Sequence, residues 1–312
     1  MRSGSVTFVK STWSYLNKNK MLIFMLLPGL VMLILFKVAP LGGMMIAFQD
    51  FSAFQGVLGS PFVGLKHFQQ MFEDPYIWTL FKNTVLLAFY TLIISFPIPI
   101  IFSLLLNELR IKYIKNAVQS LSFLPYFISA AVMVSIAYTL LSPSNGLVNM
   151  ILTSFGMESI FFMAEPGWFR TNYVTLHVWQ TFGYSAIVYI AAMSSIDPGL
   201  YESASLDGAN RLQKIIHVTL PSIKPTIFVM LIISVGEILT VDLDRILLMY
   251  NQSVYETADV IQTYVYRIVF ENTGFPEYSY GTAVNLLKSV IAFILVVGTN
   301  KLSTKYSDSR LF

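Results

Sequence analysis

Six long apolar runs, separated by more polar segments, dominate the amino-acid sequence. A helix of about 20 residues crosses a hydrocarbon core about 30 Å thick, and most of the runs are long enough to do so. Because they lack the alternation of polar and apolar positions that marks a transmembrane barrel, we expect each run to form a helix. The pattern therefore predicts an all-α integral membrane protein with six transmembrane helices. The runs lie at residues 21–38, 84–106, 118–141, 173–196, 226 to 239 or 241, and 282–299.

Prolines lie inside three of these runs. Pro28 falls in the first run, Pro97 and Pro99 in the second, and Pro125 in the third. A proline removes one backbone hydrogen bond from a helix, and membrane helices tolerate that loss at the cost of a kink. We therefore expect the first three transmembrane helices to be kinked.

The first run could be mistaken for a signal peptide, because basic residues precede it. That basic lead is long, however, and no convincing small-residue cleavage site follows the run. We therefore expect an uncleaved first transmembrane helix. The lead contains Arg2, Lys10, Lys18 and Lys20.

Composition agrees with a membrane protein and excludes several other classes. Only 12% of the residues are charged, whereas 55% are hydrophobic, and the mean hydropathy is +0.65. A soluble domain carries about 25% charged residues, so this chain cannot cover a soluble surface. The apolar content excludes disorder, and the absence of cysteine excludes a disulfide scaffold. A net charge of +3 gives no support for nucleic-acid binding.

The distribution of charge orients the helices. With a cytoplasmic N-terminus, the cytoplasmic segments hold 13 of the 20 Lys and Arg residues but only five of the 17 acidic residues. The opposite side holds seven basic and eleven acidic residues, and Glu237 falls within the fifth run. Lys and Arg are enriched in short cytoplasmic segments. We therefore predict that both termini are cytoplasmic.

The cytoplasmic segment at residues 197–225 predicts two short helices joined by a turn. Asp197 is a good N-cap and Pro198 suits the first helical position, so a helix is expected at about residues 199–206. Gly208 can adopt the positive φ that ends this helix and turns the chain.

A second short helix is expected at about residues 210–217, after which Pro221 and Pro225 should end the loop and return the chain to the membrane. An apolar stripe along this helix is formed by Leu212, Ile215 and Ile216. On periodicity alone, an amphipathic helix that merely lies on the lipid surface explains the stripe equally well.

The same loop carries a spaced motif, in which Glu202-Ser203-Ala204 is followed after three residues by Gly208 and later by Leu220-Pro221. This resembles the EAA loop of binding-protein-dependent ABC importer permeases, whose pattern is Glu-Ala-Ala, three residues, Gly, about nine residues and Ile-x-Leu-Pro. Ser203 stands at the first Ala position, and Val218 stands at the Ile position. In that family the loop is a coupling helix that docks in a cleft of the ATPase subunit. The resemblance implies this role for Glu202, Ala204, Asp207, Gly208, Ala209, Leu220 and Pro221.

The resemblance extends over almost the whole chain. Segments similar to sugar-type permeases are Pro28-Gly29, Gly64 to Phe68 and Asn83-Thr84. Segments similar to the branch that takes up oligosaccharides and polysaccharide fragments are Asp259-Val260, Thr263 to Arg267 and Tyr278 to Ala283. Two departures are His67, where the family usually has Asn, and Asn251-Gln252, where it usually has Asn-Pro.

The resemblance implies a type I ABC importer permease fold with cytoplasmic coupling helices. Residues 1–79 would hold the N-terminal tail, the first span and an extracellular segment. Residues 80–305 would form the permease core, and residues 306–312 the C-terminal tail. The expected location is the bacterial plasma membrane, and the expected function is import of a carbohydrate, either an oligosaccharide or a polysaccharide fragment. A non-sugar solute remains an alternative.

The chain is not expected to be an enzyme or to bind a cofactor itself. It contains no Gly-x-x-x-x-Gly-Lys-Ser/Thr phosphate loop, so ATP and Mg would bind to partner subunits. The resemblance implies as partners two ATPase subunits, a second homologous permease in a heterodimer, and an extracellular solute-binding protein or lipoprotein. His67, His177 and His217 are scattered and lack metal-ligand spacing, so no metal site is expected.

Candidates for the substrate path are polar and aromatic residues within the runs. Glu237 is the one acid placed inside a run, and intramembrane acids mark functional sites by default. It could instead lie at the outer boundary or pair with Arg245. The other candidates are Trp179, Gln180 and Tyr184, with weaker cases for Tyr138 and Asn285. Aromatic faces stack on sugars and amides bind hydroxyls, but helix packing and an interfacial aromatic belt would explain the same residues.

Two other functions compete with an ABC permease. A secondary transporter would need ion-coupling acids and broken helices near the midplane, and a single acid in six runs supports it poorly. An intramembrane enzyme would need a cluster of catalytic groups, and none is visible. No catalytic residue is therefore predicted.

Overall fold

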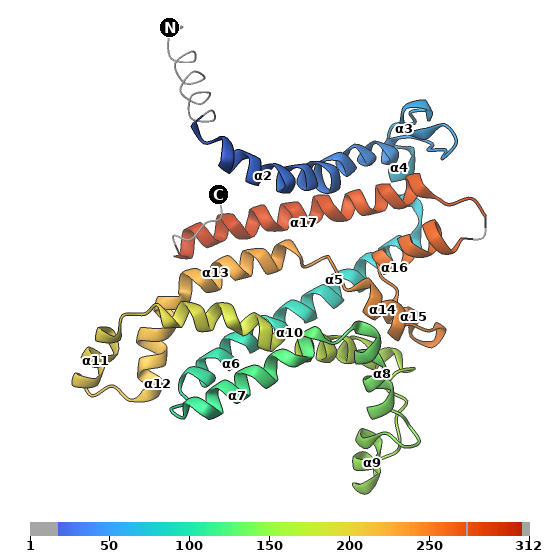
Figure 1. Ribbon diagram of the computed structural model, residues 1–312. Coiled ribbons are helices and arrows are strands. Elements are labelled where there is room, and N and C mark those ends of the chain that lie inside the picture. The colour runs from blue at the N-terminus through green and yellow to red at the C-terminus, as the bar shows by residue number, and fades with distance from the viewer. Residues whose placement is uncertain (1–17, 273, 308–312) are drawn as a thin grey trace. The chain divides into compact units, whose positions relative to one another are not determined.

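The computed structural model describes residues 18–272 and 274–307, which are almost entirely helical (Figure 1). In these ranges extended backbone is paired only at an isolated antiparallel bridge between Gln49 and Phe62. Residues 1–17 of the predicted N-terminal tail and residues 308–312 of the predicted C-terminal tail lie outside the described residues, and α17 continues into the predicted tail as far as Ser307. The chain forms two compact units, Met1–Gln70 with Glu277–Ala283, and Met71–Pro276 with Val284–Phe312.

The smaller unit begins with one long helical stretch. Helix α2 passes through a π segment into a long 3-10 segment, and two short helices follow. These elements are α2 (Lys20–Leu33), η1 (Ile34–Val38), η2 (Ala39–Phe48), α3 (Gly56–Gly59) and α4 (Lys66–Glu73), the last of which ends in the larger unit.

Asp50 links the motif at residues 64–68 to the chain before it. Its carboxylate accepts a 2.8 Å ion pair from Lys66 Nζ and lies 3.1 Å from Nε2 of His67. The hydrogen bond from Lys66 holds the pKa of Asp50 below its ordinary value. His67 also lies 3.1 Å from the carbonyl oxygen of Gln49. The imidazole that departs from the family's Asn is therefore buried in a polar contact.

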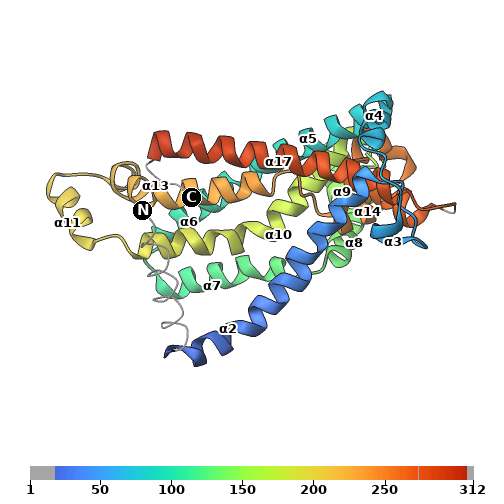
Figure 2. The same cartoon turned by 90° about the horizontal axis from the view of Figure 1, so that it is seen from above.

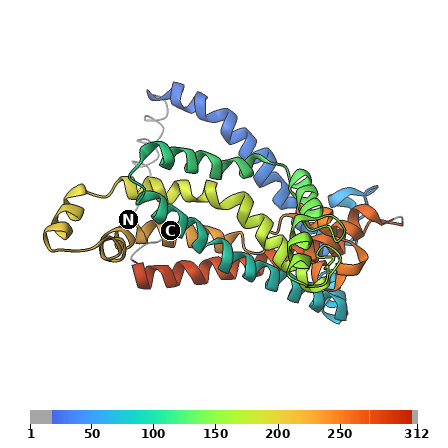
Figure 3. The ribbon, with the colours of Figure 1, turned by 90° about the horizontal axis from the view of Figure 1, so that it is seen from below.

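The larger unit consists of helices packed around α10. These elements are α5 (Pro75–Ser95), α6 (Pro97–Asn107), α7 (Lys112–Phe123), η3 (Leu124–Phe127), α8 (Ala130–Leu140), α9 (Leu147–Ser154), α10 (Pro166–Ser194), α11 (Pro198–Leu206), α12 (Arg211–Lys214), η4 (Ile215–Thr219), α13 (Leu220–Gly236), α14 (Leu243–Met249), η5 (Gln252–Val254), α15 (Tyr255–Ala258), α16 (Ile261–Tyr266), η6 (Arg267–Glu271) and α17 (Tyr278–Ser307). Helix α10 contacts α5, α6, α7 and α13. It runs between α7 on one side and α13 on the other (Figure 3).

Four helices in the described part of the chain are long and apolar enough to cross a membrane. They are Lys20–Phe48, Pro75–Asn107, Arg211–Gly236 and Tyr278–Lys301. A fifth candidate is the pair Lys112–Phe127 and Ala130–Leu140. Three of the five contain the first, second and sixth predicted runs. The bent pair covers nearly all of the third run, and Arg211–Gly236 covers the fifth only as far as Gly236, so that Glu237 lies at the end of the helix rather than within it. Helix α10 covers most of the fourth run, but polar residues such as His177 and Gln180 lower its apolarity below that of the others.

The prolines have unequal effects. Pro97 begins α6, yet helix continues from Pro75 to Asn107. Pro28 lies inside α2, which continues through it. Pro125 lies in the 3-10 turn η3, and the two halves of the third run meet just after this turn, across residues 128–129, at 102°. The sharp bend is therefore found just after the chain leaves α-helical hydrogen bonding near Pro125.

Candidate functional site

The loop after α10 begins as the sequence predicts. Asp197 caps α11 by accepting a 2.9 Å hydrogen bond on Oδ1 from the N–H of Gly199. Pro198 occupies the first turn, where its missing N–H has no cost. Gly208 follows the helix with φ of +80°, in the left-handed region that favours glycine. The predicted first helix and its glycine turn are therefore confirmed.

The second arm of the loop differs from the prediction of a short helix that ends before Pro221 and Pro225. Helix α12 runs through the π segment η4 directly into α13. One helix therefore extends from Arg211 to Gly236, and both prolines lie within it. The loop and a helix that is long and apolar enough to cross a membrane share this single element.

The local hydrogen bonds explain why the helix continues. Asn210 and Gln213 form a reciprocal capping box, with bonds of 2.9 and 2.8 Å, that starts the helix. In the π segment the N–H of Leu220 bonds to the carbonyl of Ile215, five residues back. The hydrogen-bond register therefore shifts immediately before Pro221, which has no N–H to contribute.

The loop projects from one end of α10 and α13, at the end opposite to α14 (Figure 2). Lys214 Nζ donates a 2.7 Å hydrogen bond to Ser205 Oγ and so joins its two arms. Leu206 and Leu212 are 89% and 64% exposed. Apolar side chains exposed together on a polar loop are typical of a protein-docking surface.

The seven residues carried over from the family motif lie on this loop or at its return to the membrane. Glu202, Asp207, Gly208 and Pro221 are exposed, and Ala204, Ala209 and Leu220 are partly buried. Their contact with an ATPase stays a prediction.

A cavity of about 650 Å³ lies among α5, α6, α10 and α13 of the larger unit. This volume falls in the range of pockets that hold small molecules, about 300–1,000 Å³. The charged and strongly polar groups of its lining are His177, Gln180, Glu237, Asp242 and Arg245. The remaining lining is aromatic, apolar and hydroxylic, a mixture suited to a solute with both polar and C–H faces.

Arg245 organises the polar side of the cavity. Its guanidinium forms a 3.0 Å ion pair with Asp242 and donates to Gln180, and it lies 5.5 Å from the ring centre of Tyr173. Its NH1 is 3.2 Å from Nδ1 of His177. Arginine can only donate, so Nδ1 must accept and the imidazole is neutral with its proton on Nε2. Arg245 is 2% exposed, so its charge is compensated inside the fold.

These contacts connect three parts of the chain. Gln180 of α10 donates from Nε2 to the carbonyl oxygen of Ile128 at 2.7 Å, where the chain bends between η3 and α8. The hydroxyl of Tyr173 accepts the N–H of Asp242 at 3.0 Å, just after α13. The cavity wall is therefore fixed to α10, to the bend and to the segment between α13 and α14.

Two of the six predicted path residues, Gln180 and Glu237, line the cavity. The other four lie outside its lining, and they are Trp179, Tyr184, Tyr138 and Asn285. Tyr184 stacks on the lining residue Tyr126, with ring centres 4.0 Å apart and planes 7° apart. The ion pair of Arg245 is with Asp242 rather than with Glu237. Contact of these residues with substrate stays a prediction.

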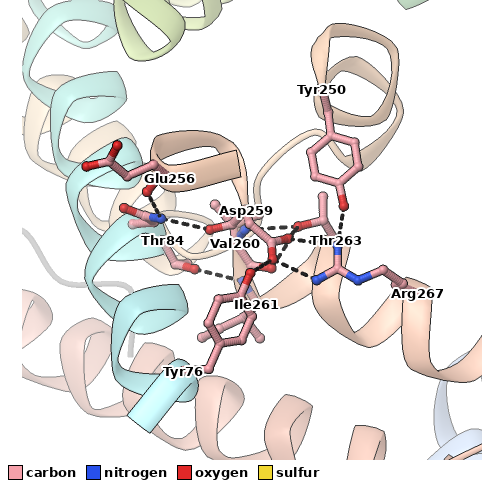
Figure 4. A network of polar contacts seen from close by, with 10 residues as sticks. Tyr76, Thr84, Tyr250, Glu256, Asp259, Val260, Ile261, Thr263 and Arg267 are labelled. Atoms are coloured by element: carbon pink, nitrogen blue, oxygen red, sulfur yellow. Dashed lines mark hydrogen bonds and ion pairs between the residues drawn. The ribbon is translucent and has the colours of Figure 1, made fainter. Parts of the chain in front are cut away.

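A second polar cluster surrounds the buried carboxylate of Asp259, between α15 and α16 (Figure 4). Asp259 is 1% exposed and forms a 2.7 Å ion pair with Arg267. It also accepts hydrogen bonds from the hydroxyls of Tyr76 and of Thr263, the latter at 2.7 Å. Burial disfavours the charge of Arg267, but hydrogen bonding and attraction to Asp259 outweigh it and raise the pKa of Arg267. Burial raises the pKa of Tyr250, whose hydroxyl accepts from Arg267.

Two polar side chains of α5 complete this cluster. Asn83 Nδ2 donates to the carbonyl oxygens of Glu256 and Asp259 at 2.9 and 3.0 Å. Thr84 Oγ1 accepts the N–H of Ile261 at 3.0 Å. The Asn-Thr pair therefore satisfies backbone groups of a segment more than 170 residues away in the sequence.

The sequence pattern does not predict the cluster of Arg245, Asp242, His177 and Tyr173. Arg245 follows the end of the fifth run, and its position there predicts only a charge on the outer side of the membrane. One local signal was available: Asp242 precedes Arg245 by three residues, the spacing of an N-cap, and its Oδ1 does accept the N–H of Arg245 at 3.2 Å.

Comparison with known proteins agrees with the architecture. Residues 81–241 match the family described as "Binding-protein-dependent transport system inner membrane component". The chain is 41% identical over 295 residues to the polygalacturonan/rhamnogalacturonan transport system permease protein YteP of Bacillus subtilis (strain 168), which covers 95% of this chain and 91% of the relative. It is 36% identical over 297 residues to Protein LplB of the same strain, covering 95% and 92%.

Solved structures give the same result. A chain of a bacterial ABC transporter involved in the import of the acidic polysaccharide alginate has a TM-score of 0.86 and 37% identity, covering 95% of this chain and 99% of that chain. A chain of an alginate transporter in complex with alginate pentasaccharide-bound periplasmic protein has a TM-score of 0.87 and 36% identity, covering 96% and 99%. The chain therefore belongs to the binding-protein-dependent transport system inner membrane components and is a permease subunit of an ABC transporter, not an enzyme.

Proposed function

We propose that this chain is one of two permease subunits of an ATP-driven importer, and that it translocates an oligosaccharide or polysaccharide fragment delivered by an extracellular binding protein. Six transmembrane helices, with α10 as the fourth, would place both termini and the loop at residues 197–225 in the cytoplasm. Two ATPase subunits would bind ATP and Mg and dock on that loop.

The observation that carries this proposal is the continuous helix Arg211–Gly236. At one end it forms an arm of the exposed loop, and at the other Met230, Ile233 and Ser234 line the cavity. A rigid element that joins a docking surface to a cavity can transmit motion between them. Movement of an ATPase against the loop would therefore reshape the cavity without any chemistry in this chain.

The lining of the cavity supports a carbohydrate as the solute. Tyr126, Tyr173 and Tyr189 offer aromatic faces for sugar C–H groups, while Gln180 and Thr181 offer hydrogen-bonding groups for hydroxyls. The relatives named for polysaccharide transport support the same class. We therefore assign the cavity to the path of the sugar.

Replacing Gly208 with valine tests the coupling role of the loop. We expect oligosaccharide uptake by the complete reconstituted transporter to fall about tenfold or more. The reason is that the new side chain would obstruct docking of the ATPase at an exposed turn. A tenfold loss corresponds to about 1.4 kcal/mol. The measurement is uptake of a labelled oligosaccharide together with ATP hydrolysis stimulated by the binding protein.

Gly156→Val is the matched control, because Gly156 and Gly208 share a positive φ (+78° and +80°) and an added Cβ would meet nothing within 4 Å at either. Both variants carry the same backbone strain, about 1–2 kcal/mol for a left-handed residue. The proposed topology places Gly156 on the extracellular side. Equal uptake by the two variants would overturn the coupling role.

A further inference from the structure

Lys288 is a cation in the middle of a membrane-spanning helix. It lies in α17, whose apolar portion extends from Tyr278 to Lys301. Among the described side chains, those of residues 18–272 and 274–301, none forms an ion pair or hydrogen bond with its ammonium group. A charge in the bilayer interior is costly, and residues that bear one mark transport paths or contacts with partners.

The face of α17 that carries Lys288 is turned into the protein. Val284, one turn before it, is 2% exposed, and Lys288 itself is partly buried. Phe293 and Ile294, on the opposite face, are 68% and 62% exposed. The lysine therefore does not point toward the apolar face of its own helix.

Helix α17 contacts α13 beside the cavity. Val296 packs against Gly236 of α13, where an added Cβ would lie 3.3 Å from Val296 Cγ2. The next residue, Glu237, lines the cavity. Lys288 is eight residues from Val296, about 12 Å along a helix that rises 1.5 Å per residue and about 80° around its axis. Lys288 therefore lies on the part of α17 that precedes this contact, and it is not among the residues that line the cavity.

Lys82 is a lysine in another apolar helix, and it differs from Lys288 in exposure and in distance from the helix end. It lies near the start of α5 and is exposed, so its stem can carry the ammonium group to the membrane surface. Lys288 is farther from either end of its span and is partly buried, so its ammonium group cannot reach the membrane surface in the same way. A lysine in such a position is open to an anion from outside this chain, because the described side chains provide none.

The charges of the cavity suit a solute that itself carries the anion. Asp242 and Arg245 compensate each other at 3.0 Å. The carboxylate of Glu237 has no ion-pair partner among the residues that the structure describes. Glu237 alone would repel an anionic sugar, and a cation on the adjoining helix face offsets that repulsion.

We propose that Lys288 is a specificity-determining residue of the translocation path, which pairs with the carboxylates of an acidic oligosaccharide as it passes. This rests on the proposed function and adds to it that the solute is anionic. It agrees with the acidic polysaccharide named for the structure with a TM-score of 0.86. An acidic side chain of the second permease is the competing partner for the ammonium group.

Uptake by the complete reconstituted transporter, with its binding protein and ATPases, tests this assignment. The acidic probes are trigalacturonate and an alginate trisaccharide, and the neutral probe is galactotriose. We expect Lys288→Met to lower uptake of an acidic probe about tenfold, the effect of losing one charge-assisted contact. Lys288→Arg, which keeps the charge, should retain most uptake. Lys82→Met is the matched control and should leave uptake unchanged.

Thermal unfolding of the same assemblies separates a path residue from a structural one. Because Lys288→Met removes an unpaired charge, it should leave the unfolding midpoint equal or higher despite the loss of uptake. Unchanged uptake would overturn the assignment, and so would a lower midpoint with dissociation of the second permease, which would indicate a structural ion pair. Wild-type import of galactotriose but of neither acidic probe would overturn only the anionic assignment. ATP hydrolysis without import of any of the three probes would overturn the proposed function as well.

Discussion

Replacing Gly183 with alanine is expected to destabilise the helices of the larger unit by about 3 kcal/mol or more, at the upper end of the cost of overpacking. Gly183 lies where α10 crosses α7, and an added Cβ would lie 2.0 Å from the carbonyl oxygen of Ser122. The clash is with backbone, so no side-chain rotation relieves it. The higher helix propensity of alanine returns only about 1 kcal/mol.

The measurement is the yield and unfolding midpoint of the detergent-purified transporter that contains the variant. Gly298→Ala in α17 is the matched control, because an added Cβ there would meet nothing within 4 Å. It should be neutral or slightly stabilising. A Gly183→Ala transporter as stable as the wild type would mean that α7 and α10 do not cross this closely.

Replacing Asp259 with asparagine is expected to cost about 3 kcal/mol, near the low end for removing one partner of a buried ion pair because Arg267 is partly exposed. The carboxylate accepts from Arg267, Tyr76 and Thr263, and an amide provides one acceptor oxygen without charge. Arg267 would keep its contacts with the rings of Tyr255 and Tyr264, at 5.5 and 5.7 Å, but would lose its counter-ion.

The expected result is a lower unfolding midpoint and faster proteolysis of the segment between α14 and α17. Glu256→Gln is the matched control, because Glu256 is an exposed acid in the same region and contributes its backbone carbonyl rather than its carboxylate to Asn83. A surface change of this kind is worth about 0.5 kcal/mol or less. If both variants were equally stable, the buried ion pair would not hold this segment.

Local signals predicted the parts of the site that depend on neighbours in sequence. The N-cap at Asp197, the proline that follows it and the positive φ of Gly208 are set by bonds within a few residues. The prediction failed at Pro221 and Pro225, because a π segment placed just before them let the helix continue. Single-residue propensities do not report such a register shift.

Sequence patterns do not predict which distant segments come into contact. Asn83-Thr84 and Asp259-Val260 each resemble a family motif, and only the fold shows that the first pair forms hydrogen bonds with the backbone around the second. The role of Arg245 likewise depends on α10 supplying His177 and Gln180. Its position after the fifth run predicts the outer side, and only the tertiary contacts show that it lies in the cavity wall.

This chain should move a sugar only when partner subunits hydrolyse ATP. The most direct measurement is accumulation of a labelled oligosaccharide in liposomes that contain either the complete transporter or this chain alone. Accumulation should require ATP, the ATPase subunits and the binding protein, and should be absent for the chain alone under a proton or sodium gradient. Gradient-driven accumulation by the chain alone would contradict the account and indicate a secondary transporter.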